Sequence, residues 1–284
     1  MFGKKLNSLF ATSNFFLKML EILFYSFSPA IYCTMDKGEI KGFVFDVGGV
    51  FRDSSRALNF SFKKAFESKG LSFSFSVEET WRLEGFDEFN DHYQINKALL
   101  AASRAKANVA KILKKADPVK AMLKIIEENV SENDEQMLRE MENFTSKVFS
   151  TEGQRLMMVF PGAKEAIRLL HSKKFSLAVV TVPPTEFSAR WLKENISDYF
   201  NPVIGGDKYK DKADGLKQCC AAFNLLPKQV AMVGDATVDV RTGKKAGTKT
   251  VALLCGMGML KFLRKEKPDL VFKDLREMAK YFCE

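Results

Sequence analysis

The feature that most constrains the fold is an apolar segment at residues 42–47 that carries one acid, Asp46, and is followed by Gly48 and Gly49. A continuous apolar run of this length is typical of a strand that is buried on both faces of a parallel sheet. A carboxylate in such a strand costs free energy unless it has a partner. We therefore predict a buried parallel strand whose carboxyl end opens into a functional site at Asp46.

The second half of the chain alternates between predicted strands and predicted helices. The strands are expected at residues 175–181, 203–204, 229–234 and 250–254, and the helices at residues 163–172, 185–195, 214–224, 237–246 and 275–282. Alternation of this kind indicates a parallel sheet with helices on both faces, and ligands bind at the carboxyl ends of its strands. We therefore expect an α/β fold with a Rossmann-like parallel sheet as its core.

A long helical stretch separates the first strand from the second. Residues 56 to about 149 show helical spacing and almost no strand signal. The chain is long enough for two units, since domains usually comprise ~100–150 residues. The expected organisation is an N-terminal extension at residues 1–34, a core formed by residues 35–53 and 156–284, and an inserted helical unit at residues 54–155.

The first 34 residues are apolar and aromatic, but Lys18 and Glu21 interrupt them. The uninterrupted apolar piece at residues 22–31 is shorter than the ~20 residues that a bilayer span needs, and no clear cleavage pattern of a secretory signal follows it. Two interpretations remain open. Either Met35 is the true start, or residues 1–34 are genuine and form a membrane-associating or docking helix.

Composition bears on the partners and the compartment. The net charge of +9 is spread along the chain, which suits a small anionic substrate. There is no basic stripe with interleaved aromatic residues and no Cys/His metal knuckle, so we predict no nucleic-acid partner. The five cysteines lack metal-ligand spacing, which favours a reducing cytoplasm. The sequence leaves open whether the chain is a monomer or a homodimer.

Polar residues follow three of the predicted strands. Asp46 ends the first strand, Thr181 ends the second, and Gly234-Asp235 with Asp239 follows the strand at residues 229–234. Taken alone, Asp235 could cap a helix and Thr181 suits a strand, whereas Asp46 has no good structural explanation, because an unpaired acid at the end of a buried strand costs free energy. Parallel topology, however, brings all these strand ends to one edge of the sheet.

A lysine in the loop before residue 214 adds a cation to the same edge. The candidates are Lys210 and Lys212. A carboxylate that faces a phosphate dianion is repelled unless a divalent cation and a lysine neutralise the site. Carboxylate and carbonyl oxygens are the ligands that Mg²⁺ prefers.

With these motifs in this order, the sequence resembles the haloacid dehalogenase superfamily. The similarity rests on Asp46-Val47-Gly48-Gly49-Val50, Thr181, Lys210 and Gly234-Asp235 with Asp239, and it extends from about residue 41 to the C-terminus. It implies that the inserted helices form a cap like that of phosphoglycolate phosphatase-like members. The implied activity is Mg²⁺-dependent hydrolysis of a small phosphorylated metabolite by way of an aspartyl-phosphate.

The resemblance also implies a role for each motif residue. The catalytic residues would be Asp46 as nucleophile, Thr181 and Lys210; the phosphate-binding groups would be Gly48, Gly49, Thr181, Val182 and Lys210; the metal ligands would be Asp46, the Gly48 carbonyl, Asp235 and Asp239. By similarity to the family, the spacing back from Asp235 selects Lys210, and one inserted residue would select Lys212. For Asp239 the resemblance leaves open whether it supports the metal or the lysine. Substrate choice would depend on the cap, where Trp81, Arg82, His92 and Tyr93 are candidates by residue type alone.

Two positions depart from the usual pattern of the family. Gly48 stands where most of its phosphatases carry a second aspartate, whose general acid-base catalysis is typically worth ~10²–10⁴ in rate. A substrate with a good leaving group is therefore favoured. Val182 stands where relatives often have Asn, which leaves only the backbone amide of Val182 for phosphate binding. Asp53 is another acid near this loop, but its position favours capping of the helix that follows.

These departures keep two alternatives open. One is a dehalogenase, since dehalogenases of the superfamily also lack the second aspartate but use no metal. The acidic pair Asp235 and Asp239 favours the metal-dependent phosphatase over the dehalogenase. The other alternative is a catalytically weakened fold that serves as a binding or regulatory module.

Overall fold

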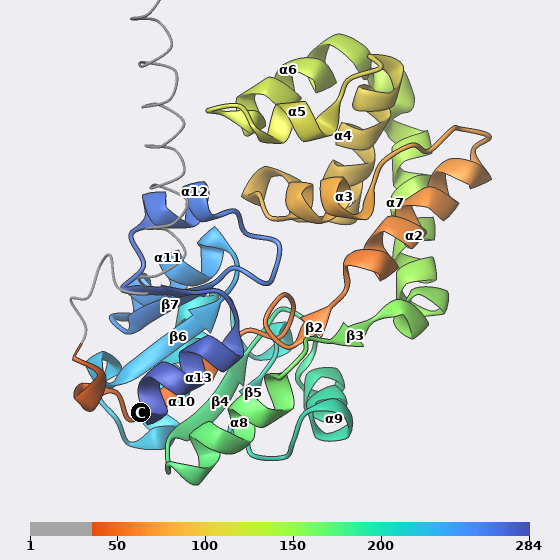
Figure 1. Cartoon of the computed structure of the whole chain (residues 1–284). Coiled ribbons are helices and arrows are strands. Elements are labelled where there is room, and N and C mark those ends of the chain that lie inside the picture. Colours follow the sequence, from red (N-terminus) through yellow and green to blue (C-terminus); the bar gives the residue numbers. More distant parts are fainter. Residues whose placement is uncertain (1–35) are drawn as a thin grey trace, which may run out of the picture.

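The computed structural model describes residues 36–284 and contains a six-stranded parallel sheet with the order β5-β4-β1-β6-β7-β8 (Figure 1). The strands are β1 (Gly42–Phe45), β4 (Ser176–Val180), β5 (Val203–Ile204), β6 (Val230–Gly234), β7 (Lys249–Leu253) and β8 (Leu270–Phe272). The helices around the sheet are α8 (Ala163–Ser172), α9 (Thr185–Asn195), α10 (Lys212–Phe223), α11 (Thr237–Ala246), α12 (Leu260–Leu263) and α13 (Leu275–Cys283). This architecture confirms the predicted α/β fold with a Rossmann-like core.

The side chains of β1 alternate between two hydrophobic clusters on opposite faces of the sheet. Phe43 and Phe45 belong to a cluster that contains residues of α8, α9 and α13, whereas Val44 packs with residues of α10 and α11. All three side chains are fully buried. Successive residues of a strand point to opposite faces, so β1 is covered on both sides, as its continuous apolar sequence predicted.

Six helices are inserted between the short strands β2 (Arg52–Asp53) and β3 (Met158–Val159), which pair antiparallel. They are α2 (Ser55–Ser68), α3 (Val77–Glu84), α4 (His92–Arg104), α5 (Val109–Leu113), α6 (Pro118–Asn129) and α7 (Glu135–Ser150). These helices fall within residues 54–155, and they enclose a hydrophobic cluster that is separate from those of the sheet. Figure 1 shows this helical unit beside the core, with the β2–β3 ribbon between them.

The helical unit also contacts the core directly, through the loop that follows β7. Arg82 of α3 donates hydrogen bonds to the carbonyls of Gly256 and Gly258, at 2.8 and 3.0 Å. In the opposite direction, Lys261 of α12 donates hydrogen bonds to the carbonyl of Leu113, the last residue of α5, at 3.0 Å, and to that of Lys115 at 2.7 Å. The helical unit therefore lies against the carboxyl end of the sheet.

Most element boundaries lie within two residues of those predicted, and one difference matters for the site. Helix α10 begins at Lys212 rather than at residue 214, because the Asp211 side chain caps it by accepting a hydrogen bond from the Ala213 amide at 2.8 Å. The strands β2, β3 and β8 were not predicted from the sequence. Strands of two or three residues are too short to show a period-two pattern.

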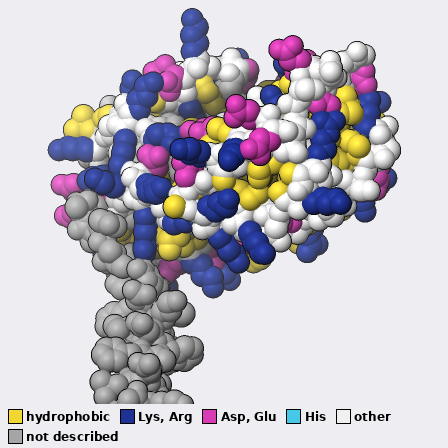
Figure 2. Space-filling view, turned by 90° about the horizontal axis from the view of Figure 1, so that it is seen from above, with side chains coloured by type: hydrophobic (Ala, Val, Ile, Leu, Met, Phe, Trp, Pro, Cys, Tyr) yellow, Lys and Arg dark blue, Asp and Glu magenta, His cyan; other side chains and the backbone are white. Residues whose placement is uncertain are grey.

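The distribution of surface charge and the lengths of the helices concern the predicted partners and the predicted N-terminal extension. Figure 2 shows Lys and Arg side chains spread over one face of the molecule, with Asp and Glu side chains between them. Among residues 36–284, no helix has the length and apolar character required to cross a bilayer. The predicted N-terminal extension, residues 1–34, lies outside the described residues.

The core position of Phe45 leads to a first prediction. Replacing this fully buried ring in Phe45→Ala leaves a cavity, so we expect the free energy of unfolding to fall by about 3–5 kcal/mol. Phe144→Ala, at a ring of α7 that is 38% exposed, serves as the control and should cost less than about 1 kcal/mol. Urea unfolding followed by circular dichroism measures both values. Equal losses for the two variants would contradict the assignment of Phe45 to the core.

Candidate active site

The carboxyl ends of the three neighbouring strands β4, β1 and β6 carry Thr181, Asp46 and Asp235. A cavity of about 290 Å³ opens at this edge of the sheet. The core lines it with Asp46, Gly48, Arg52, Thr181, Val182, Lys212, Asp235 and Asp239, and the helical unit lines it with Trp81, Glu84, Asp87 and His92, among others. Strand ends that are far apart in the sequence thus meet in one partly open cavity, which the inserted helices also line.

Lys212 connects two carboxylates of this site. Its Nζ donates to Oδ1 of Asp46 and to Oδ1 of Asp239, both at 2.8 Å. Burial alone would lower the pKa of Lys212, but Asp239 and Asp46 outweigh it and raise the pKa, so the ammonium stays charged.

The lysine that spacing selected, Lys210, is exposed and does not line this cavity. The assignment of Lys210 to the site is therefore corrected to Lys212. The physical reason is the start of α10: the cap at Asp211 places residue 212 in the first turn of the helix, beside the sheet, while residue 210 stays in the preceding loop.

Three largely buried carboxylates share this single ammonium. Burial raises the pKa of Asp46, and the charge of Lys212 opposes that rise. Burial, followed by the negative charges of Asp239 and Asp46, raises the pKa of Asp235 well above its usual value. With all three acids ionised, Asp46, Asp235, Asp239 and Lys212 carry an excess of two negative charges. Arg52 and Glu84, which line the same cavity, carry opposite charges when both are ionised and leave this excess unchanged. The donor atoms and this excess fit a divalent cation.

Two loops approach the Asp235 carboxylate so closely that each has room only for glycine at the point of contact. Its Oδ2 accepts a hydrogen bond from the Met257 amide at 2.7 Å. A Cβ atom at Gly49 would lie 2.1 Å from this Oδ2, and a Cβ atom at Gly256 would lie 2.0 Å from it. Gly49 also has a φ of +71°, which disfavours any other residue. The two glycines therefore allow the loops to close around this acid.

The two oxygens of Asp239 have other partners. Oδ1 accepts from Lys212, and Oδ2 accepts from the Ala236 amide at 3.1 Å. Of the two roles left open for Asp239, the geometry favours support of the lysine over metal ligation. No group of three or more His, Cys, Asp or Glu side chains within residues 36–284 could by itself hold a metal ion. Mg²⁺ is commonly bound by one or two carboxylates completed by other oxygens and waters, which Asp46, Asp235 and the Gly48 carbonyl could supply.

The predicted phosphate-binding residues do not all reach the cavity. Thr181 is 1% exposed, and its hydroxyl is close enough to Asp46 to lower the pKa of that carboxyl. Gly48 and Val182 line the cavity, whereas Gly49 does not. The Gly49 amide donates to the Arg52 carbonyl at 3.0 Å instead. The structure therefore gives Gly49 a steric role beside Asp235 rather than the predicted contact with phosphate.

Sequence reasoning missed three charged residues of the cavity, Asp87, Arg52 and Glu84; the last two have atoms buried at the site. Arg52 Nε and Glu84 Oε2 are shielded from solvent, and neither has a hydrogen-bond partner in the described part of the chain. The Arg52 guanidinium lies over the rings of Phe187 and Trp191, at 5.9 and 5.4 Å from the ring centroids. Burial raises the pKa of Glu84 to about 7, and the charge of Arg52 opposes that rise. No motif marks either residue, because only the fold brings them to the site.

The residues named by type in the helical unit have different positions. Trp81 and His92 line the cavity. Arg82 binds the core loop, and the Tyr93 hydroxyl donates to Glu135, so neither is placed to contact a ligand there. Asp53 accepts a hydrogen bond from the Ser55 amide at 2.9 Å, as its predicted capping role requires.

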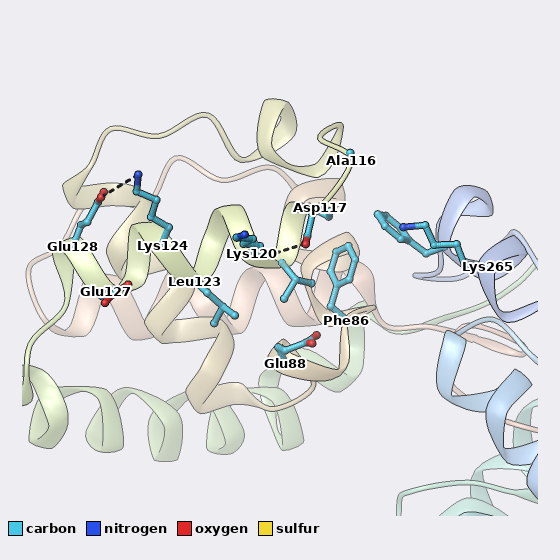
Figure 3. Close-up of a pocket in the computed structure, with 13 residues that line it drawn as sticks. Phe86, Glu88, Ala116, Asp117, Lys120, Leu123, Lys124, Glu127, Glu128 and Lys265 are labelled. Carbon is cyan, nitrogen blue, oxygen red and sulfur yellow. Dashed lines mark hydrogen bonds and ion pairs between the residues drawn. The ribbon is translucent and has the colours of Figure 1, made fainter.

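A second groove lies outside this site, between α6 and the segment that follows α12. Figure 3 shows it lined by Phe86, Leu123 and Lys265, with Lys124 and Glu128 paired at its rim. The motif residues Asp46, Thr181 and Asp235 do not line this groove. The chemistry of the molecule is therefore assigned to the cavity at the strand ends.

Comparison with known proteins identifies the class to which this fold and site belong. Residues 43–253 match the family model described as haloacid dehalogenase-like hydrolase, and the chain belongs to this family. It is similar to the phosphoglycolate phosphatase of Salmonella typhi, with 26% identity over 84% of this chain and 91% of that protein. The predicted family and the prediction of a phosphatase-type hydrolase are confirmed.

Solved structures show the same fold. A putative phosphoglycolate phosphatase from Lactobacillus delbrueckii subsp. bulgaricus has a TM-score of 0.67 and 20% identity, covering 85% of this chain and 98% of that one. A predicted phosphoglycolate phosphatase from Haemophilus somnus has a TM-score of 0.61 and 22% identity, covering 86% and 98%. The architecture of a parallel core with a helical insertion is thus shared with these proteins.

The raised pKa of Glu84 leads to a prediction about stability. An acid whose pKa rises from 4.5 to about 7 on folding binds its proton more tightly in the folded state, so its stabilising effect is complete below pH 4.5 and is lost as the pH rises to 7. Relative to Glu84→Gln, the wild type should lose about 3 kcal/mol of unfolding free energy over this interval. Urea unfolding at several pH values measures the difference. Glu88→Gln, at an exposed position, should follow the wild type; parallel curves for the wild type and Glu84→Gln would refute the prediction.

Proposed function

We propose that this protein is a Mg²⁺-dependent phosphatase that transfers the phosphoryl group of a small phosphorylated metabolite to Asp46 and then to water. The observation that carries the proposal is the position of Asp46 at the carboxyl end of β1. There it accepts a hydrogen bond from Lys212, and the neighbouring strand β6 ends beside the second buried acid, Asp235. The phosphoglycolate phosphatases among its relatives support a small anionic substrate. The cavity volume of about 290 Å³ also suits a small ligand, since ligand pockets usually measure ~300–1,000 Å³.

Lys212 and Asp239 prepare the nucleophile. The ammonium opposes the effect of burial on Asp46 and so favours the carboxylate, which is the form that attacks phosphorus. Asp239 holds the ammonium in place by the 2.8 Å hydrogen bond. Lys212 would also face the oxygens of the transferring phosphoryl group, where negative charge develops.

The remaining groups position the substrate. The Thr181 hydroxyl and the backbone at Gly48 and Val182 would contact phosphoryl oxygens at the carboxyl ends of the strands. Asp46, Asp235 and the Gly48 carbonyl would hold Mg²⁺, which when bound supplies positive charge to the phosphoryl oxygens. The helical unit would act as the cap that excludes water during transfer. The excess of two negative charges is the reason for favouring this reaction over a metal-free dehalogenation.

The compartment follows from the thiols. Cys219, Cys220, Cys255 and Cys283, the cysteines within the described residues, are all unpaired. Unpaired thiols are typical of a reducing compartment, so we place the protein in the cytoplasm. We propose a small phosphorylated molecule as the partner, and no nucleic acid.

The assignment of the nucleophile gives the first prediction about activity. With Mg²⁺, the wild type should release inorganic phosphate from a panel of aryl, acyl, anomeric and alkyl phosphates, and EDTA should abolish the release. Asp46→Asn should reduce turnover by more than about 10³-fold, because it removes the group that forms the covalent intermediate. Circular dichroism confirms that the variant is folded. Chloride release from 2-chloroacids without metal, in place of phosphate release, would establish the dehalogenase instead.

The corrected lysine gives a second prediction about activity. Lys212→Met should lower turnover by about 10²–10³-fold, because it removes a charge that stabilises the transition state. Lys210→Met, two residues away at an exposed position, is the matched control and should retain activity within about twofold. Phosphate release under saturating substrate measures both. The opposite result, with Lys210→Met inactive and Lys212→Met active, would restore the assignment made from spacing.

A further inference from the structure

We propose that Glu84, the last residue of α3, is the general acid and base of this enzyme and takes the place of the aspartate that is missing at Gly48. This role rests on the proposed phosphatase function and deepens it. The proton donor would then belong to the helical unit, while the nucleophile belongs to the core. The donor would be in place only when the two units are in contact.

The first support is the way the end of α3 is fixed to the core. Two residues before Glu84, Arg82 donates to the carbonyls of Gly256 and Gly258. One residue after it, Gly85 approaches the Met257 carbonyl so closely that a Cβ atom would lie 3.0 Å from that oxygen. The Met257 amide in turn donates to Asp235. The backbone on both sides of Glu84 is therefore docked on the loop that positions Asp235.

The second support is the lack of a structural partner for the carboxyl group. Glu84 Oε2 is shielded from solvent and accepts no hydrogen bond from any residue within 36–284. Burying a polar group in this way costs free energy. Arg52, which carries the opposite charge and lines the same cavity, forms no ion pair with Glu84 among the described residues and leaves its own Nε unpaired. A ligand that enters between them would satisfy both groups.

The third support is that Glu84 shares one cavity with the nucleophile. Asp46, Arg52 and Glu84 all line this cavity, and Arg52 interacts electrostatically with both carboxyl groups. In phosphoryl transfer the attacking and leaving oxygens lie roughly in line on opposite sides of phosphorus. The proposed role requires Glu84 to face the leaving oxygen, across phosphorus from Asp46.

The protonation of Glu84 suits this role. Burial holds its pKa at about 7, with Arg52 opposing the rise, so both forms are populated near neutral pH. The other titratable groups that line the cavity are Asp46, Asp87, His92, Lys212, Asp235 and Asp239. A carboxylic acid that is half protonated at neutral pH can donate a proton in one step and accept one in the next.

The two steps balance as follows. Asp46 attacks phosphorus and the bond between phosphorus and the leaving oxygen breaks, while the Glu84 carboxylic acid gives its proton to that oxygen, so the alcohol leaves neutral. A water molecule then attacks the phosphorus of the aspartyl-phosphate, and the Glu84 carboxylate takes a proton from it. The bond to Asp46 breaks, inorganic phosphate leaves, and both side chains return to their starting forms.

The test compares two substrates that differ in their need for a proton. 4-Nitrophenyl phosphate has a stable leaving anion, whereas glycerol 1-phosphate has an alkoxide leaving group that must be protonated. Wild type, Glu84→Gln and the exposed control Glu88→Gln are assayed with Mg²⁺ on both, as kcat and KM from pH 5 to 9, with circular dichroism as the check of folding. Single-turnover assays measure formation of the aspartyl-phosphate apart from its hydrolysis.

We expect Glu84→Gln to lower single-turnover cleavage of glycerol 1-phosphate by ~10²–10⁴-fold and that of 4-nitrophenyl phosphate by less than about threefold. The wild-type rate with glycerol 1-phosphate should fall as the pH rises above about 7, and this decline should be absent in Glu84→Gln. Glu84→Asp should recover part of the activity. Glu88→Gln should match the wild type on both substrates.

Other outcomes overturn the proposal. Equal losses of single-turnover cleavage on the two substrates, or a change in KM alone, would make Glu84 a binding or packing residue. Unchanged cleavage of glycerol 1-phosphate by Glu84→Gln would show that it donates no proton. A wild type that hydrolyses neither substrate would refute the phosphatase function itself, and this result differs from the others because it is seen without any substitution.

Discussion

The site depends on one ammonium that holds two carboxylates from different elements. Lys212 of α10 bridges Asp46 at the end of β1 and Asp239 of α11, at 2.8 Å from each. Burial raises the pKa of Asp46, and the charge of Lys212 opposes that rise and so favours the carboxylate. The Asp211 side chain caps α10 and fixes where this helix begins. That starting point determines that Lys212, rather than Lys210, contacts Asp46.

The sequence was sufficient to predict those features that follow from topology. Apolar runs that end in Asp46, Thr181 and Asp235 can be recognised as parallel strands, and parallel strands bring their ends together. Choosing between Lys210 and Lys212 required the geometry of a helix start, which spacing does not contain. Glu84 could not be predicted, because its position depends on how an inserted helix docks on a distant loop.

The loop after β7 links the helical unit to the acidic site. Gly256 and Gly258 accept the hydrogen bonds of Arg82, and the amide of Met257, between them, holds Asp235. Docking of α3 and positioning of Asp235 thus use adjacent peptide groups. Displacement of the helical unit would remove Glu84 from the cavity. It would also loosen the loop whose Met257 amide binds Asp235. The site residues of the helical unit and those of the core would therefore be brought into position together.

The antiparallel pairing of β2 and β3 has a consequence for how such proteins diversify. Arg52 pairs with Val159 and Asp53 with Met158, so the chain leaves the sheet domain and returns to it at adjacent points. The helical insert is therefore joined to the sheet domain by two chain segments that lie side by side. Recombination or drift can replace the helical insert without rerouting any strand of the sheet. The residues that the insert contributes to the site, Glu84 among them, can therefore change while Asp46, Lys212 and Asp235 of the core are retained.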